Sequence, residues 1–189
     1  MTALLTERLA LDPVTERNAL ALWRVMQNAH LREFQDVPRF TRDEFTRRVK
    51  ARPRGFDGKT PGRFEWLIVE RESGTPIGWM SLRITEQTNA SAELGYSLLL
   101  PARRKGYATE AGRAVVELAF ETGLTTVEAC CVPQNVASRR VLENIGFSQV
   151  RLQRSGAVVR GRPVDVCVYR LARRERAVER VMDRRQTQS

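Results

Sequence analysis

A basic, glycine-containing turn between an expected strand and an expected helix most constrains the fold of this chain. The strand is expected over residues 92–100, the turn reads Arg103-Arg104-Lys105-Gly106-Tyr107-Ala108, and the helix is expected over residues 109–122. Unpaired N–H groups and the positive end of the helix dipole would meet three cationic side chains at one point. Such a point favours anions, most naturally phosphate. The turn therefore predicts a site for a phosphorylated cofactor.

Two other phosphate-binding motifs are absent from the sequence. The lack of G-x-G-x-x-G and of G-x-x-x-x-G-K-[ST] argues against nicotinamide dinucleotides and ATP. A basic turn alone also fits a solvated connection in an arginine-rich protein. The segment after the expected helix gives further information about the kind of site. It contains an apolar run expected to be a strand over 126–132, and then the pattern Asn135-x-x-Ser138-x-x-x-Leu142-x-x-x-Gly146-Phe147.

Together, Arg103-x-x-Gly106-x-Ala108 and the motif that begins at Asn135 resemble the GNAT superfamily of acyl-CoA-dependent N-acetyltransferases, within it the RimJ/RimL-type branch. The resemblance implies an α+β fold with a twisted mixed sheet, helices on both faces, and strands that part near Leu99 and Cys131 to admit pantetheine. It also implies acetyl-CoA as cosubstrate without a metal. The acetyl group would pass to a primary amine, on a protein N-terminus or a small molecule, by direct attack in a ternary complex.

Length and composition fit one domain, expected over residues 1–172, followed by a basic helical or frayed tail over 173–189. The chain has no apolar run long enough for a bilayer and no signal peptide, so a cytoplasmic protein is expected, either monomer or homodimer. Cys130, Cys131 and Cys167 read as buried thiols. The net charge is +10, but acidic residues are interspersed among the arginines, so nucleic-acid binding is not the favoured interpretation.

The remaining elements follow from periodicity and turn residues. A strand over 6–13 and a helix capped by Thr15 and running to Gln27 are expected first. A second helix is expected from Thr41, where Thr41-x-x-Glu44 has capping-box spacing. Strands over 64–69 and 77–82, and a terminal hairpin around Gly161-Arg162-Pro163, complete the sheet.

The cofactor site is expected to involve residues on both sides of the turn. The resemblance implies that main-chain groups near Leu98, Leu99 and Leu100 pair with pantetheine and polarise the thioester carbonyl. It also implies that the loop N–H groups bind the pyrophosphate, with Gly106 allowing close approach. The expected cofactor-binding residues are Leu98, Leu99, Leu100, Arg103, Arg104, Lys105, Gly106, Tyr107, Ala108, Thr109, Asn135 and Ser138.

Two residues are expected to act in catalysis. Many superfamily members protonate the departing thiolate with a tyrosine, but this sequence has Leu142 at the matching position, so Ser138 is the alternative acid. Asn135 and Ser138 share a helical face, from which Asn135 could bond a pantetheine amide. The alternative roles are a plain helix cap for Asn135 and a surface position for Ser138. Glu93 is the expected base, directly or through water; the alternative is an ion pair with an arginine.

Other residues are weaker candidates. Asp165 and Glu128 are alternative bases, and His30 is expected to lie near the acceptor site without a catalytic role. Phe34 and Tyr96 are expected to shape the acceptor pocket, and Trp79 to pack in the core. The expected partners are acetyl-CoA and an amine acceptor, for which a ribosomal-protein N-terminus is one candidate. A protein of another class also remains open: a catalytically weak CoA-binding or RNA- or ribosome-associated module.

Overall fold

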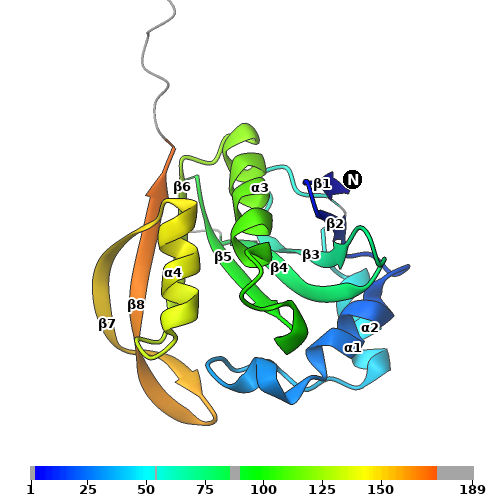
Figure 1. Cartoon of the computed structure of the whole chain (residues 1–189), viewed down its shortest axis with the longest axis horizontal. Coiled ribbons are helices and arrows are strands. Elements are labelled where there is room, and N and C mark those ends of the chain that lie inside the picture. Colours follow the sequence, from blue (N-terminus) through cyan, green and yellow to red (C-terminus); the bar gives the residue numbers. More distant parts are fainter. Residues whose placement is uncertain (1–2, 54, 86–89, 174–189) are drawn as a thin grey trace, which may run out of the picture.

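The computed structural model describes residues 3–53, 55–85 and 90–173. One eight-stranded sheet has the order β1-β2-β3-β4-β5-β6-β8-β7. Helices α3 and α4 lie on one face, and α1 and α2 pack on the other (Figure 1). The strands are β1 (Leu4–Leu5), β2 (Leu9–Pro13), β3 (Gly62–Glu70), β4 (Pro76–Ile84), β5 (Ser91–Leu98), β6 (Thr126–Cys131), β7 (Ser148–Val159) and β8 (Arg162–Ala172). The helices are α1 (Ala19–Met26), α2 (Arg42–Lys50), α3 (Tyr107–Glu121) and α4 (Val136–Ile145), with 3₁₀ turns η1 (Ala29–Arg32) and η2 (Leu100–Ala102). The expected mixed α+β architecture is confirmed.

Two cores hold the layers together. The larger core packs α3 against the sheet through small and branched residues, including Ala111, Val115 and Ala119, each fully buried. The smaller core packs α1 and α2 against β3 and β4, with Trp79 in its centre. The small residues let the α3 backbone lie close to the sheet. Trp79 is therefore a core residue, as expected.

Helix boundaries follow local hydrogen bonding. The capping box of α2 is formed, because Glu44 N–H donates to Thr41 Oγ1 and the Glu44 carboxylate accepts from Thr41 N–H at 2.8 Å. The expected cap at Thr15 is wrong. Thr15 N–H donates to Asn18 Oδ1 at 2.8 Å, so residues 15–18 form a turn and α1 begins only at Ala19.

The expected boundaries around the basic turn also need correction. Strand β5 ends at Leu98 rather than at Leu100, because Leu100 begins the η2 turn. Helix α3 begins at Tyr107 rather than at Thr109. Gly106 precedes it with a φ of +81°, a left-handed conformation that suits glycine. The loop is therefore tighter than the sequence suggests, and Tyr107 and Ala108 belong to the helix.

The sheet opens between β5 and β6. These strands pair in parallel from Ser91–Thr126 to Leu94–Ala129. Beyond that point β5 stays paired with β4 as far as Leu98, and β6 stays paired with β8 as far as Cys131. The two strands therefore diverge while each keeps its outer neighbour. This confirms the expected parting of the strands.

The C-terminal hairpin of β7 and β8 extends past the open end of the sheet (Figure 1). The segment before α2 reaches it: Phe34 packs on the cluster of Val132, Val166 and Val168, and Arg160 N–H donates to Asp36 Oδ1 at 3.3 Å. The expected tail over 173–189 lies outside the described residues, apart from Arg173. No helix among the described residues is long and apolar enough to cross a membrane.

Gly78 provides a test of the β4–β5 packing beside the opening. A Cβ added at Gly78 would lie 2.3 Å from the Ser97 carbonyl oxygen, which is backbone and cannot rotate away. Overpacking of this kind costs about 1–3 kcal/mol. We expect Gly78→Ala to lower the free energy of unfolding by that amount in a denaturant titration. Gly55→Ala is the control, because nothing lies within 4 Å of its added Cβ. Equal stability of the two variants would contradict the close approach.

Candidate active site

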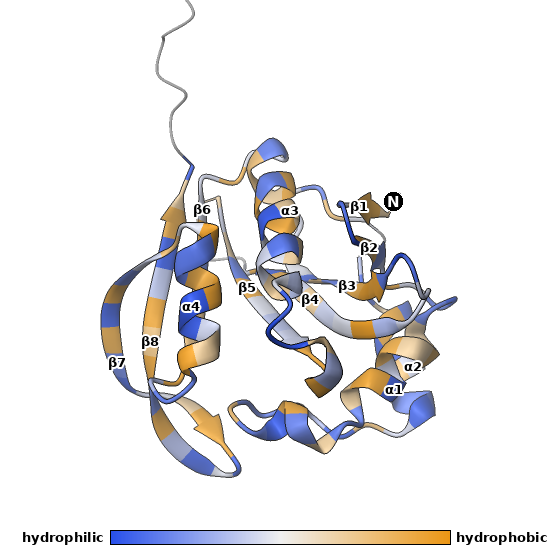
Figure 2. Cartoon of the chain, viewed as in Figure 1, coloured by the Kyte–Doolittle hydropathy of each residue, from blue (hydrophilic) through white to orange (hydrophobic). Residues whose placement is uncertain are grey.

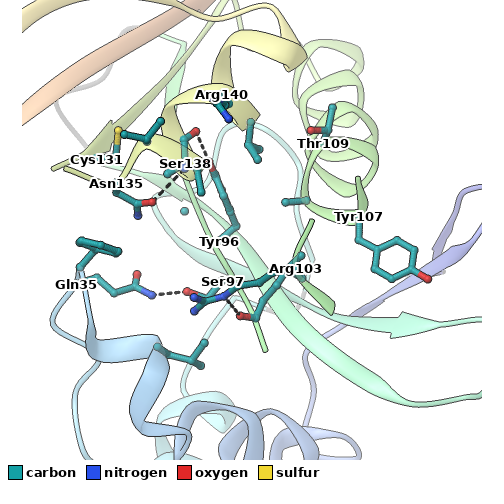
Figure 3. A pocket seen from close by; sticks show the side chains of 18 of the residues that line it. Gln35, Tyr96, Ser97, Arg103, Tyr107, Thr109, Cys131, Asn135, Ser138 and Arg140 are labelled. Carbon is teal, nitrogen blue, oxygen red and sulfur yellow. Dashed lines mark hydrogen bonds between the residues drawn. The ribbon is translucent and has the colours of Figure 1, made fainter. Parts of the chain in front are cut away.

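A cavity of about 740 Å³ occupies the gap between the diverging strands, and Figure 3 shows its lining. Its walls come from the segment after α1, the end of β5, the basic loop with the start of α3, the end of β6, and one face of α4. The lining residues are His30, Leu31, Glu33, Phe34, Gln35, Leu94, Gly95, Tyr96, Ser97, Leu98, Arg103, Arg104, Gly106, Tyr107, Ala108, Thr109, Cys130, Cys131, Asn135, Val136, Ala137, Ser138, Arg140, Val141 and Asn144.

The loop before α3 presents backbone donors at one end of the cavity. Two of its residues, Arg104 (φ +63°) and Gly106 (φ +81°), are left-handed. The bond from Glu110 N–H to the Gly106 carbonyl opens the helix, so the N–H groups of residues 107–109 precede its hydrogen-bonded part. Successive N–H groups in such a curved backbone form an anion-binding concavity. The loop is also strongly hydrophilic (Figure 2). This geometry fits a diphosphate.

The cationic side chains of the loop do not all point to this concavity. Lys105 is not among the lining residues, and its Nζ lies 5.9 Å from the centroid of the Tyr107 ring. The Tyr107 side chain is directed away from the cavity (Figure 3). Lys105 and Tyr107 are thus placed to shape the loop, and Tyr107 can offer a ligand its backbone.

The Arg103 side chain connects two walls of the cavity. Its Nε donates to the Leu98 carbonyl at 3.1 Å, and its Nη2 donates to the His30 carbonyl at 3.4 Å. Its Nη1 lies 3.8 Å from a Glu33 carboxylate oxygen. Arg103 therefore joins the end of β5 to the segment after α1.

The backbone that faces the gap belongs to Tyr96 and Leu98. Leu99 N–H donates to the Ile77 carbonyl at 2.8 Å, so residues 97 and 99 direct their backbone groups toward β4. Alternation along the strand then turns the N–H groups of residues 96 and 98 toward the gap. The expectation for Leu99 and Leu100 needs correction: Leu99 is bonded to β4, Leu100 lies in η2, and neither lines the cavity.

Helix α4 directs Asn135 and Ser138 into the cavity. Asn135 caps the helix, because its Oδ1 accepts from Ser138 N–H at 3.1 Å, so the cap role weighed in the sequence is present. Tyr96 Oη lies 2.8 Å from Ser138 Oγ and donates to the Ser138 carbonyl at 3.1 Å (Figure 3). Burial raises the pKa of Tyr96 well above its usual value, so the phenol stays protonated. Leu142 is 1% exposed and lies in the core.

Two cysteines line the end of β6. Cys131 is buried, whereas Cys130 is exposed, so the expectation of three buried thiols is wrong for Cys130. Burial raises the pKa of Cys131 to about 11, although a hydrogen bond with Ser138 partly opposes this shift. A thiol that stays protonated at neutral pH is a poor nucleophile.

Glu93 is not among the residues that line the cavity, although the next residue, Leu94, is. It forms an ion pair with Arg83, its partner in the β4–β5 register. On the strand it shares a face with Gly95 and Ser97, which do line the cavity. Partial burial, and after it the negative charges of Glu93 and Glu128, raise the pKa of Cys130. The other weighed carboxylates pair elsewhere: Glu128 with Arg170, and Asp165 with Arg154.

The opposite wall comes from the segment after α1. His30, Glu33, Phe34 and Gln35 line it, and Gln35 Nε2 donates to Ser97 Oγ (Figure 3). Sequence reasoning found His30 and Phe34 but missed Gln35 and the pairing of Tyr96 with Ser138. No local signal identifies Gln35, because its contact joins positions 62 residues apart. Among the described residues, no group of three His, Cys, Asp or Glu side chains is arranged to hold a metal ion.

The comparisons agree with this geometry. The acetyltransferase (GNAT) domain family matches residues 8–148. The uncharacterized N-acetyltransferase p20 of Bacillus licheniformis is 28% identical over 180 residues, which cover 94% of this chain and 99% of that protein. YdaF of Bacillus subtilis, provisionally named a ribosomal N-acetyltransferase, is 37% identical over 103 residues, which cover 54% of this chain and 56% of YdaF.

Solved structures share the fold. RimL, a ribosomal L7/L12 alpha-N-protein acetyltransferase in complex with coenzyme A, superposes with a TM-score of 0.77 at 20% identity, covering 90% of this chain and 97% of RimL. The ribosomal-protein-S5-alanine acetyltransferase of Vibrio fischeri superposes with a TM-score of 0.79 at 17% identity, and the match covers 93% of this chain and 98% of that protein. The family match spans most of the sequence and includes the loop, β5 and α4. The chain therefore belongs to the GNAT family of acetyltransferases, and the expected class of enzyme, an acetyl-CoA-dependent N-acetyltransferase, is confirmed.

Proposed function

We propose that this enzyme acetylates a primary amine, in the first place the N-terminal amine of a protein, by direct attack on acetyl-CoA in a ternary complex. The observation that carries the proposal is the continuity of the cavity. It runs from the N–H groups before α3, past the backbone of Tyr96 and Leu98, to Ser138 and the segment 30–35. These parts of the cavity follow one another in the same order as the diphosphate, the pantetheine and the thioester of acetyl-CoA, with the amine acceptor last.

The thioester carbonyl is placed where β5 offers an unpaired donor. The N–H of Leu98 faces the gap and can bond the carbonyl oxygen, while the amide groups of pantetheine pair with the backbone of Tyr96. A donor aimed at the developing oxyanion contributes about 3–4 kcal/mol to transition-state stabilisation. The acceptor nitrogen attacks the carbonyl carbon, and the carbon–sulfur bond breaks.

Ser138 stabilises the departing thiolate. A serine hydroxyl is a weaker acid than a thiol, so it acts by donating a hydrogen bond to sulfur rather than by losing its proton completely. Tyr96 stays protonated, and its Oη lies 2.8 Å from Ser138 Oγ. In this proposal the phenol turns its one proton from the Ser138 carbonyl to Ser138 Oγ, which leaves the serine proton free for the sulfur. The high pKa of Cys131 disfavours an acetyl-cysteine intermediate and supports direct attack.

The proposal of a protein as the acceptor comes from the similarity to YdaF, which is provisionally named a ribosomal N-acetyltransferase. The cavity is compatible with it, because its wall at residues 30–35 is joined to the C-terminal hairpin through Phe34, which packs on Val166 and Val168. Glu33, the one carboxylate among the described lining residues, is half exposed and can attract the cationic terminus.

The proposal is tested with coenzyme A and defined amines. We expect calorimetry to show CoA binding and thiol release to require a peptide with a free N-terminus, while the same peptide with a blocked N-terminus gives none. Gly106→Glu should abolish CoA binding, because it places bulk and negative charge at the loop. Gly123→Glu is the control, at a left-handed position beyond the other end of α3. CoA binding without any amine acceptor, together with salt-dependent RNA binding, would favour the module of another class.

Ser138→Ala tests the role of the hydroxyl. We expect kcat to fall about 100-fold, the lower end of the range for removing one hydrogen-bond donor to a developing negative charge, with KM for acetyl-CoA nearly unchanged. Tyr96→Phe should give a smaller fall, because the hydroxyl remains but is less well held. Ser148→Ala, at an exposed position in β7, is the matched control. Weaker cofactor binding with unchanged turnover would reject the role of Ser138.

Glu93→Gln tests the base. We propose that Glu93 accepts the amine proton through water, so the variant should lose about 100-fold in kcat/KM and recover activity at higher pH, where more of the amine is neutral. Glu128→Gln is the control, because Glu128 lies opposite Glu93 in the parallel register and is also paired with an arginine. Similar losses in both variants would assign Glu93 a structural role.

A further inference from the structure

The first turn of α3 carries a negative charge close to its anion site. Glu110 is placed one turn into the helix, beside the N–H groups proposed to bind the diphosphate. A carboxylate there competes for the positive end of the helix dipole and repels a second anion. Glu110 is not among the residues that line the cavity. Its carboxylate therefore needs partners outside the cavity that compensate its negative charge.

The turn between β1 and β2 holds this carboxylate. Thr6 Oγ1 and Arg8 N–H donate to Glu110 Oε1 at 2.6 and 2.9 Å. Arg8 Nε donates to Oε2 at 2.8 Å, and Arg8 Nη2 lies 2.6 Å from the same oxygen. Both carboxylate oxygens are therefore bonded. Burial opposes ionisation of Glu110, but the bonds from Thr6 and Arg8 outweigh it and hold the pKa below its usual value, so the carboxylate stays charged.

Arg8 also reaches the loop itself. Its Nη1 donates to the Lys105 carbonyl at 2.9 Å, between the left-handed residues Arg104 and Gly106. Its guanidinium lies 4.7 Å from the centroid of the Tyr107 ring. Non-glycine residues in the left-handed region persist where surrounding contacts determine them. One side chain thus contacts the loop, the first helical residue and the carboxylate.

Glu70 and Arg71, at the end of β3, hold the first residue of α3 and the β1–β2 turn, respectively. Tyr107 Oη donates to Glu70, whose other oxygen accepts from Ser73 Oγ at 2.7 Å. Arg71 Nη1 donates to the Thr6 carbonyl at 2.6 Å. Arg71 N–H also donates to the Arg8 carbonyl at 2.9 Å, so Arg71 holds the turn that carries Arg8 independently of the loop before α3.

We propose that Arg8 is a positioning residue for the diphosphate of acetyl-CoA: it neutralises Glu110 and fixes the Lys105 carbonyl, so that the loop N–H groups face the ligand. This inference rests on the proposed function. Without Arg8, Glu110 would carry an uncompensated charge beside the diphosphate, and the loop would lose its bond at Lys105. Removing the Glu110 charge as well should restore part of the affinity.

The test is a double-mutant cycle with two acetyl donors. Arg8→Met, Glu110→Gln and the double variant are compared for CoA affinity by calorimetry, and for kcat/KM with acetyl-CoA and with S-acetylpantetheine, which lacks the diphosphate. We expect Arg8→Met to weaken CoA binding about tenfold, the size of one charge-assisted hydrogen bond. Activity with acetyl-CoA should fall equally and activity with S-acetylpantetheine by less than about twofold. The double variant should bind CoA more tightly than Arg8→Met.

Arg71→Met is the control, because it removes contacts of the same turn but none to Glu110 or Lys105. Arg8→Lys serves if Arg8→Met does not fold; it keeps the charge, loses the forked geometry and should bind CoA between wild type and Arg8→Met. Equal losses with both donors, or an equal effect of Arg71→Met, would overturn the inference. Unchanged CoA affinity in both Arg8 variants would also overturn it and leave the proposed function intact. A wild-type chain that gives no heat with CoA overturns both.

Discussion

Two strands that pair in parallel over only four residue pairs and then diverge impose the central constraint on this structure. Past Leu94 and Ala129, backbone N–H and C=O groups lose their neighbouring strand, and such groups are costly to bury without partners. Because the gap is an open cavity, these groups are not buried without partners. In the proposed mechanism, the amide groups of pantetheine take the place of the missing strand. The loop, α4 and the segment after α1 all border this opening.

Charged and neutral groups occupy different parts of the cavity. At one end, the loop and the start of α3 offer unpaired N–H groups and Arg104. In the middle, Tyr96, Ser138 and Cys131 are neutral hydrogen-bonding groups whose protons stay in place. In the proposed mechanism, the anionic part of the ligand is therefore held far from the bond that breaks. Affinity for the cofactor would then depend mainly on the loop end of the cavity, and reactivity on its middle.

Local sequence patterns predicted much of this arrangement. The capping box at Thr41, the strand–loop–helix unit at Gly106 and the terminal hairpin each depend on neighbouring residues, and each is present. The errors arose where distant contacts decide the outcome. Leu99 was expected to face the ligand, but pairing with β4 turns its N–H away. The role of Lys105 in phosphate binding remains a prediction, and the contact of Arg8 with its carbonyl could not be read from the local pattern. The catalytic roles of Glu93 and Ser138 remain predictions.

The contact between Phe34, Asp36 and the β7–β8 hairpin has a consequence for how such enzymes diversify. The wall proposed to meet the acceptor is assembled from two connections separated by more than 120 positions in the chain. Neither connection carries the loop proposed to bind the diphosphate of the donor. Insertions or substitutions in these connections can therefore alter amine selectivity while the donor half of the enzyme is inherited unchanged.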